Sequence, residues 1–228
     1  MSLAISGTDT GVGKTVVSAL ILARYGKPAG RLAYWKPVAT GAERDRDTIF
    51  VRTRVGDRVE VIDEEYRFNP PVSPHLAARL QGVEIDLGRL KAAWGRHAAD
   101  RERALVVEGV GGLLVPLNDR GDLLADLIKI LGIPVAIVAR TALGTINHTL
   151  LTVEAARRRG IEVAGLIMNG PPSPENREAI ERFADVRVLA EVAPLRGGQN
   201  PSKAAIVEAA RAFDPEGLLA ASLGAEAR

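Results

Sequence analysis

The chain has 228 residues, 46% of them hydrophobic, and a formal net charge of +2. This length favours one sizeable α/β domain over two small ones, and basic side chains spread without a dense cluster give no indication of nucleic-acid binding. The sequence contains no cysteine, which excludes disulfides, thiolate nucleophiles and cysteine zinc sites and fits a reducing cytosol.

The first predicted strand covers residues 3–6 and leads into a glycine-rich turn, Gly7-Thr8-Asp9-Thr10-Gly11-Val12-Gly13-Lys14-Thr15, and then into a helix over residues 15–25. Such a turn is typical of phosphate-binding loops, in which backbone N–H groups surround the polyphosphate, lysine neutralises charge and threonine ligates Mg²⁺. The general pattern has glycine where this chain has Thr8, so a plain strand-to-helix turn is an alternative. The order of strand, loop and helix favours the nucleotide site. Because the strand begins almost at Met1, we also expect no signal peptide.

The second predicted strand covers residues 31–35 and ends at Lys36-Pro37-Val38-Ala39-Thr40-Gly41. Ligands gather at the carboxyl ends of parallel strands, so Lys36 and Thr40 are expected on the same rim as the phosphate loop. Lysine occurs only at positions 14, 27, 36, 91, 129 and 203. A lysine within a motif of this arginine-rich chain therefore indicates a need for a compact ammonium, although a solvated lysine at a strand end is an equally ordinary interpretation.

Three segments with weaker signals follow. Asp47 closes the run 45–47 before a predicted helix through Ile49 and Val51, where an aspartate can be either a helix cap or a metal ligand. A helix is predicted to begin at Pro74 after a Ser73 cap, and we interpret residues 85–97 as a structural amphipathic helix. For His75, a metal-binding or general-base role is the minority interpretation.

The next predicted strand, residues 104–107, is buried and ends in Glu108-Gly109-Val110-Gly111-Gly112. A carboxylate at the tip of an apolar strand is costly to bury unless a cation faces it, and Mg²⁺ held by the phosphate loop is the candidate cation. The glycines would let backbone pass close to phosphate, although glycine-rich turns are common.

Two further strands, residues 134–139 and 163–168, end in polar segments. The first leads into Gly144-Thr145-Ile146-Asn147, the start of a helix that continues to about residue 159 and a favourable place for a carboxylate. The second ends at Asn169-Gly170, where the side-chain amide of Asn169 can start a turn or offer a donor and an acceptor to the edge of a nucleotide base. A last strand is predicted at 186–189, followed by the loop 192–200 and a helix from about 202, and the tail after Leu218 is expected to be frayed.

Strands that alternate with helices throughout the chain predict a single α/β domain over residues 1–228. Its central sheet is expected to be mostly parallel with helices on both faces, as in P-loop NTPases. No apolar run approaches membrane-spanning length, so we expect a cytoplasmic protein with no membrane partner.

Five motifs occur in an order that resembles the dethiobiotin synthetase family, over roughly residues 3 to 195. They are Gly7-Thr8-Asp9-Thr10-Gly11-Val12-Gly13-Lys14-Thr15, Tyr34-Trp35-Lys36-Pro37-Val38-Ala39-Thr40-Gly41, Pro71-Val72-Ser73-Pro74-His75, Val107-Glu108-Gly109-Val110-Gly111-Gly112 and Gly144-Thr145-Ile146-Asn147-His148. The combination is far more specific than any one motif. The unusual spacing of the phosphate loop is the form that this family uses.

The resemblance implies ATP-dependent closure of a ureido ring, with ATP as co-substrate and Mg²⁺ as cofactor. A carbamate forms from CO₂ and one amine of 7,8-diaminononanoate, its oxygen attacks the γ-phosphate, and the second amine displaces phosphate from the mixed anhydride. Such a reaction depends mainly on positioning and charge neutralisation and needs no dedicated protein base.

The resemblance also implies a role for individual residues. Lys14 and Lys36 would be catalytic, and Thr15, Asp47 and Glu108 would ligate Mg²⁺ directly or through water. The implied ATP contacts are Gly11, Val12, Gly13, Lys14, Thr15, Val16, Asp47, Glu108, Gly109, Val110, Gly111, Asn169, Gly170, Ala193, Pro194 and Leu195. The implied substrate contacts are Thr10, Lys36, Thr40, Gly144, Thr145, Ile146 and Asn147. The helix beginning near Thr145 would belong to the neighbouring subunit of a homodimer whose active sites lie at the interface.

Two departures and two rival families bear on this resemblance. Gly11 stands where better-known members carry glutamate, and the loop 193–200 matches weakly, which leaves the adenine contacts beyond Asn169 open. A partition-type or septum-site switch ATPase would share the fold, but its loop carries a lysine at the position of Asp9. A single-chain cobyrinate-type amidating enzyme would need a cysteine nucleophile, which the chain lacks.

Overall fold

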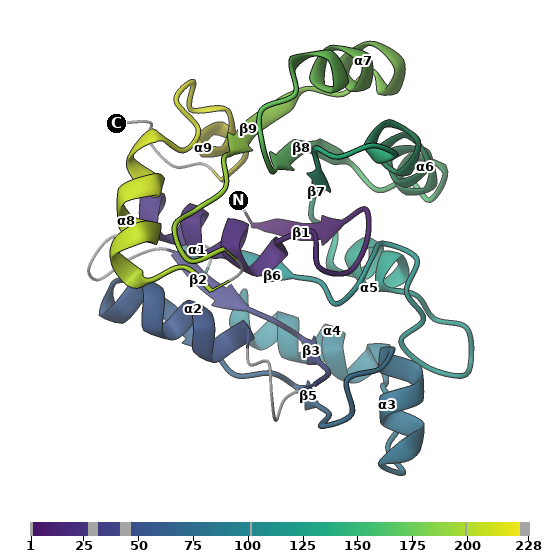
Figure 1. Ribbon diagram of the computed structural model, residues 1–228. Coiled ribbons are helices and arrows are strands. Elements are labelled where there is room, and N and C mark those ends of the chain that lie inside the picture. The colour runs from purple at the N-terminus through teal and green to yellow at the C-terminus, as the bar shows by residue number, and fades with distance from the viewer. Residues whose placement is uncertain (1, 27–31, 42–46, 101, 199, 224–228) are drawn as a thin grey trace.

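The computed structural model describes residues 2–26, 32–41, 47–100, 102–198 and 200–223 (Figure 1). Seven parallel strands form the central sheet, in the order β4-β2-β6-β1-β7-β8-β9. Their bounds are β1 Leu3–Gly7, β2 Leu32–Trp35, β4 Glu60–Ile62, β6 Ala104–Glu108, β7 Val135–Arg140, β8 Val163–Asn169 and β9 Val188–Val192. The strand carrying the phosphate loop is therefore central, and all seven strand ends lie along one rim.

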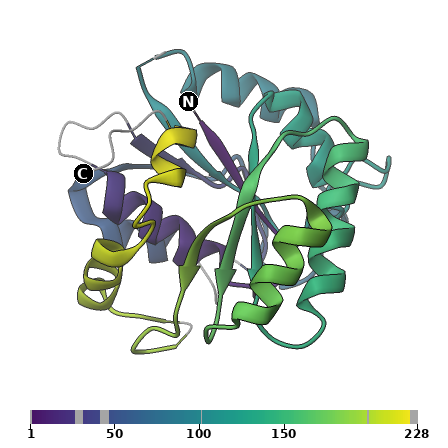
Figure 2. The same ribbon diagram turned by 90° about the horizontal axis from the view of Figure 1, so that it is seen from above.

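Helices cover both faces of this sheet (Figure 2). One face packs against α1 Lys14–Tyr25, α2 Asp47–Val55, α8 Lys203–Ala212 and α9 Leu218–Leu223. The other packs against α4 Leu87–His97, α5 Leu124–Leu131, α6 Thr145–Arg158 and α7 Pro174–Ala184. Strand β1 shows how alternation builds the two layers, because Leu3 and Ile5 enter the first core while Ala4 enters the second. The predicted parallel sheet with helices on both faces is confirmed.

Smaller elements complete the rim near the end of β2. Strand β3, Val38–Ala39, pairs in parallel with β5, Tyr66–Arg67, to form a separate two-stranded sheet. Helix α3, Pro74–Leu80, follows, with Pro74 in its first turn as predicted. Ser73 precedes the helix, but within the described residues its side chain makes no capping hydrogen bond, so the predicted cap is wrong in that respect. A 3₁₀ turn, η1 Gly56–Arg58, connects α2 to the edge strand β4.

Register along the sheet places the charged motifs beside one another. Strand β1 pairs with β6 so that Ile5 lies opposite Glu108, and β2 pairs with β6 so that Trp35 lies opposite Val107. Lys36, the residue after Trp35, is thereby brought next to Glu108 at the rim. The phosphate loop begins two residues after Ile5, so three motifs distant in sequence meet at adjacent strand ends.

The sequence prediction was wrong about the first part of the tail, residues 219–223. Residues after 218 were expected to be frayed, but α9 packs Leu219 and Leu223 into the core, and the Asp214 carboxylate accepts hydrogen bonds from the backbone N–H groups of Leu218, Leu219 and Ala220. The carboxylate thereby satisfies helix donors that would otherwise lack partners. Residues 224–228 lie outside the described part of the chain.

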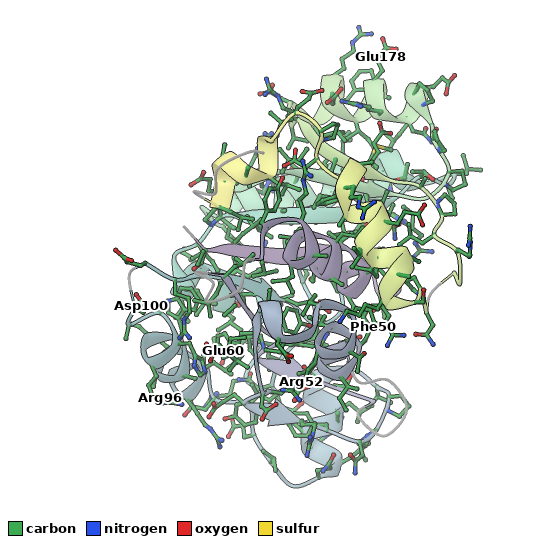
Figure 3. All side chains as sticks on the ribbon, turned by 90° about the vertical axis from the view of Figure 1, so that its left-hand side faces the viewer. Phe50, Arg52, Glu60, Arg96, Asp100 and Glu178 are labelled. Carbon is green, nitrogen blue, oxygen red and sulfur yellow. The ribbon has the colours of Figure 1, made fainter. Side chains whose placement is uncertain are left out.

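Several exposed ion pairs lie at the periphery, including the edge of the sheet. Arg103 pairs with Glu60 of β4, and Arg52 of α2 pairs with Asp63 just beyond that strand; Figure 3 labels Glu60 and Arg52 on this side of the molecule. Charges of this kind discourage pairing of an edge strand with another chain. Among the described residues, no helix has the length and apolarity needed to cross a membrane.

Candidate active site

The phosphate loop connects β1 to α1 through two glycines with positive φ. Gly13 has φ 96°, and a Cβ built there would lie 2.0 Å from Asn169 Nδ2, so both the backbone conformation and the space require glycine. Gly11 has φ 72°, faces open space and is exposed. Thr10 is exposed beside it, and Val16 lies half-buried in the first turn of α1.

Lys14 curls back over this loop. Its side chain is buried, and its Nζ donates to the Asp9 carbonyl at 3.2 Å. Burial and the nearby Lys36 ammonium lower the Lys14 pKa to about 8, while Glu108 and Asp47 oppose that change. An ammonium in this position is short of negative partners, and a bound polyphosphate would supply them.

Lys36 faces two carboxylates at the end of β2. Its Nζ lies 2.9 Å from Glu108 Oε1 and 2.5 Å from Asp47 Oδ2. Lys36 is 3% exposed and Glu108 0%, so this ion pair is buried, while the Asp47 side chain is 27% exposed. Burial alone would lower the Lys36 pKa, but Glu108 and Asp47 outweigh it and raise the pKa above its usual value. Burial would raise the Asp47 pKa, and Lys36 outweighs that effect and lowers it.

This network changes the interpretation of Glu108. The sequence predicted that a buried carboxylate at this strand tip needs a cation and named Mg²⁺ as the candidate. In the structure the cation facing Glu108 is the Lys36 ammonium. Asp47 is the first residue of α2, and its side chain turns toward Lys36 and Thr15.

Thr15 completes the cluster with more acceptors than one hydroxyl can serve. Its Oγ1 lies 2.9 Å from Asp47 Oδ1 and 2.8 Å from Glu108 Oε1. A hydroxyl carries a single proton, so it donates to only one of these oxygens at a time. Three oxygens, from Thr15, Asp47 and Glu108, therefore converge, and one of the two contacts between the hydroxyl and the carboxylates has no proton to share. A small divalent cation bound among these oxygens would relieve that repulsion.

The donor set is small for a metal site. The described residues contain no cluster of three or more His, Cys, Asp or Glu side chains able to hold a metal ion. A cation here would thus take two carboxylates, one hydroxyl and oxygens from another molecule. Mg²⁺ is commonly held this way, through one or two carboxylates plus substrate phosphates.

Two buried hydroxyls on Glu108 were missed from the sequence. Ser18 Oγ and Tyr34 OH donate to Glu108 Oε2 at 2.8 Å and 3.0 Å. A signal for both was available: Ser18 is three residues after Thr15 on one helix face, and Tyr34 is two residues before Lys36 on one face of a strand.

The segments after Glu108 and Lys36 hold the rim together through backbone contacts. Gly109 donates its N–H to the Ile5 carbonyl at 2.9 Å, and a Cβ there would lie 2.6 Å from Leu124. Val110 and Gly111 follow, half-buried, in the turn beyond it. Thr40 is half-buried at the end of the other segment.

Asn169 lies against the phosphate loop at the end of β8. Its Nδ2 donates to the Val12 carbonyl at 2.8 Å, so this donor, which the sequence interpretation offered to a base edge, is engaged by the loop itself. Gly170 donates its N–H to the Val192 carbonyl at 2.9 Å. The following Ala193 and Pro194 are exposed, and Leu195 is half-buried against the core.

The start of α6 lies farther along the rim. Gly144 has φ 92° and precedes the helix, and buried Thr145 donates its Oγ1 to the Arg140 carbonyl at 2.5 Å. Ile146 is half-buried and Asn147 exposed. Helix α6 follows β7, which lies three strands from β2, so about 14 Å of rim separates its start from Lys36 at about 4.8 Å per strand. The structure does not bring these two predicted substrate contacts together within one chain.

Arg140 links that end of the rim to the phosphate loop. Its Nη2 lies 2.5 Å from Asp9 Oδ2, and both side chains are about half exposed. His75 stands in the first turn of α3, where its buried Nδ1 has no hydrogen-bond partner among the described residues.

Comparison with known proteins adds the family context. The family model described as "AAA domain" matches residues 1–202. The ATP-dependent dethiobiotin synthetase BioD of Paramagnetospirillum magneticum is 44% identical over 84% of this chain and 87% of its own length. The enzyme of the same name from Brucella ovis is 43% identical over 88% of this chain and 89% of its own.

Solved structures resemble the chain in fold. A ParA family ATPase from Chlorobium tepidum has a TM-score of 0.57 at 11% identity, covering 92% of this chain and 98% of its own. The septum site-determining protein MinD from Pyrococcus horikoshii, complexed with Mg-ADP, has a TM-score of 0.52 at 16% identity, covering 93% and 96%. At these identities the likeness shows a shared fold and no more.

Proposed function

The chain belongs to the ATP-dependent dethiobiotin synthetase family, and from that premise we propose how its residues carry out the reaction. The chain is an ATP-dependent ligase of biotin biosynthesis. One amine of 7,8-diaminononanoate and CO₂ give a carbamate, whose oxygen forms a bond to the γ-phosphorus as ADP leaves. The second amine then attacks the carbamoyl carbon, and phosphate leaves with the oxygen that bridged carbon and phosphorus.

The observation that carries this proposal is the position of Lys36. Its ammonium is buried at the rim beside the phosphate loop, and two carboxylates keep it protonated. A permanently charged ammonium suits the neutralisation of an anionic carbamate and of the transferred phosphoryl group, and it does not suit a general base. We assign Lys36 to that role.

Nucleotide binding falls to the loop between β1 and α1. The backbone N–H groups of residues 11–15 and the Lys14 ammonium would surround the β- and γ-phosphates. The Lys14 pKa is lowered to about 8, so its charged form is disfavoured in the protein alone. Negatively charged phosphate oxygens beside it would stabilise the protonated ammonium. Gly109, Val110 and Gly111 would let backbone approach the same phosphates.

Thr15, Asp47 and Glu108 would hold Mg²⁺. The fit rests on their converging oxygens, which outnumber the available hydroxyl protons. When bound, Mg²⁺ would neutralise charge on the β- and γ-phosphate oxygens.

The adenine base of ATP would lie between the ends of β8 and β9. Asn169 ends β8 and Gly170 follows it, and the segment Ala193–Leu195 follows the neighbouring strand β9. Since the Asn169 Nδ2 is bonded to the phosphate loop, its Oδ1 is the atom we assign to the base, as an acceptor.

The substrate would reach two parts of the molecule. Thr10 and Thr40 lie on the rim that carries Lys36 and would contact the diamino end. Gly144, Thr145, Ile146 and Asn147 would receive the distant carboxylate at the start of α6. The separation of about 14 Å between these regions in one chain supports placing α6 of a partner subunit over each active site, in a homodimer with a two-fold axis.

A partition-type switch ATPase shares the architecture and is not favoured. At the loop position where that class carries a lysine, this chain has Asp9, which is paired with Arg140 of the same chain. The curated relatives at 43–44% identity are named for dethiobiotin synthesis. We further propose that the enzyme works in the cytoplasm, where its small-molecule substrates are made.

The test is the substrate dependence of phosphate release. Purified protein with MgATP should release phosphate only when 7,8-diaminononanoate and bicarbonate are both present. Release that ignores the diamino acid but responds to a protein or DNA partner would overturn the proposal in favour of a switch ATPase.

A further inference from the structure

We propose that Tyr34 and Ser18 are positioning residues that orient the Glu108 carboxylate and thereby make the site selective for Mg²⁺ over larger divalent cations. The inference rests on the proposed function, because it takes Glu108 as a ligand of that cation. It assigns work to two side chains that lie outside the set predicted to contact ATP, metal or substrate.

The two oxygens of Glu108 have different surroundings. Oε2 accepts from Ser18 Oγ at 2.8 Å and from Tyr34 OH at 3.0 Å. Oε1 faces the opposite way, toward Thr15 Oγ1 at 2.8 Å and Lys36 Nζ at 2.9 Å. Oε2 is thus bound to two side chains of the buried scaffold, and Oε1 is bound to Thr15 and Lys36, the side chains that we place next to the cation and the phosphates.

The scaffold contacts are rigid because they are fully buried. Tyr34, Ser18 and Glu108 are each 0% exposed. They come from three different elements, β2, α1 and β6, so a neighbouring strand and a covering helix both hold the carboxylate.

Two donors on one oxygen restrict the last torsion of the side chain. The terminal torsion of a glutamate is broad and roughly two-fold, so a free carboxylate turns readily and can offer both oxygens to a cation. With Oε2 held by Tyr34 and Ser18, only Oε1 is presented to the cluster around Thr15. Binding through a single oxygen meets the octahedral demand of Mg²⁺, whereas Ca²⁺ favours more ligands and readily takes a carboxylate through both oxygens.

The experiment compares Tyr34→Phe and Ser18→Ala with the parent. The readout is the dissociation constant of a non-hydrolysable ATP analogue, measured calorimetrically in EDTA, in Mg²⁺ and in Ca²⁺. A hydrogen bond to a charged group is lost in each variant, so we expect Mg²⁺ to enhance nucleotide binding about tenfold less than in the parent. The ratio of Ca²⁺-supported to Mg²⁺-supported binding should rise.

A matched control is available at Tyr25. Its hydroxyl donates to the Asp214 carboxylate between α1 and the start of α9, away from the rim. Tyr25→Phe removes the same tyrosine-to-carboxylate hydrogen bond, so it should lower the Tm while leaving the Mg²⁺ enhancement and the Ca²⁺ to Mg²⁺ ratio at parental values. This separates a loss of orientation from a loss of stability.

The outcomes separate this inference from the function on which it rests. A parent whose nucleotide affinity ignores Mg²⁺ would overturn the metal assignment itself. A parent that responds to Mg²⁺, with Tyr34→Phe and Ser18→Ala responding equally, would overturn only the positioning role. Should Tyr34→Phe fail to fold, Ser18→Ala, the smaller change on the same oxygen, decides the question alone.

Discussion

Replacing Lys36 by methionine tests whether its ammonium holds the two carboxylates of the site together. The change keeps an unbranched side chain and removes the cation that lies 2.9 Å from Glu108 and 2.5 Å from Asp47. Removing one partner of a buried ion pair costs about 3–5 kcal/mol, because the remaining charge is left without compensation. For a chain of 228 residues this corresponds to a fall in Tm of about 6–10 °C, at about 2 °C per kcal/mol.

The dependence of this loss on pH identifies its cause. The Asp47 pKa is lowered from 3.8 in the folded parent, so its pairing contributes stability above that value and loses it as pH falls through the folded pKa. The Lys36 pKa is raised from 10.5, so its contribution is full below that value and is lost as pH rises through the folded pKa. The Tm of the parent should therefore exceed that of Lys36→Met by the largest margin between about pH 5 and pH 10, and by a smaller margin at pH 3.

The assay is thermal unfolding in EDTA without nucleotide, followed by circular dichroism across this pH range. Lys91→Met serves as control, since Lys91 is exposed on α4 and its replacement should change stability by no more than about 0.5 kcal/mol. Adding Mg²⁺ alone should recover part of the loss in Lys36→Met, because its carboxylates are free to bind a cation. Equal stability of the two methionine variants at neutral pH would refute the reasoning.

Three further predictions concern turnover, proton uptake and the substrate carboxylate. Lys36→Arg should lower kcat about a hundredfold or more while the Kd for ATP changes less than about threefold. The reason is that a planar guanidinium cannot follow the charge that moves in the transition state as a compact ammonium does. A normal kcat would remove Lys36 from the mechanism. Nucleotide binding at pH 8 should take up about half a proton, since the Lys14 pKa is about 8 before phosphate raises it, and almost none at pH 6.5. Calorimetry in buffers of different ionisation enthalpy measures this uptake, and a value that does not vary with pH would contradict the assignment. The free diamino acid should outcompete its methyl ester, and one residue inserted between Gly144 and Thr145 should raise KM for the diamino acid far more than for ATP. Equal affinity for acid and ester, or a fully active monomer at the assay concentration, would contradict the role given to α6.

Sequence patterns predicted the parts of the site that depend on local order. The phosphate loop follows an apolar strand directly, and Lys36 and Glu108 stand at strand ends, so their common rim follows from parallel topology alone. Sequence could not supply the order of the strands. Because β2 lies beside β6, Lys36 reaches Glu108 and provides the cation that the sequence interpretation had sought in a metal.

The missed features depend on contacts between distant segments. Strand β5 and helix α7 carry few apolar residues, so their patterns are weak, and β3 and β5 contain two residues each. The ordered tail depends on Asp214, which has a positive φ of 52° and accepts hydrogen bonds from the start of α9. The short segment Leu218–Leu223 has no sequence pattern that would predict these contacts. Tyr34 and Ser18 were given no role of their own from the sequence, because their partner Glu108 lies 74 and 90 residues away.

The most direct test of the reaction is the fate of the carbon dioxide oxygen. If a carbamate oxygen attacks the γ-phosphate and the second amine later expels phosphate, one oxygen of CO₂ must leave on phosphorus. Reaction with ¹⁸O-labelled bicarbonate, quenched before the label exchanges with water, should therefore give phosphate that carries one ¹⁸O atom for each ring closed. Unlabelled phosphate released at the same rate as the ring product would show that water attacks ATP and would contradict the account.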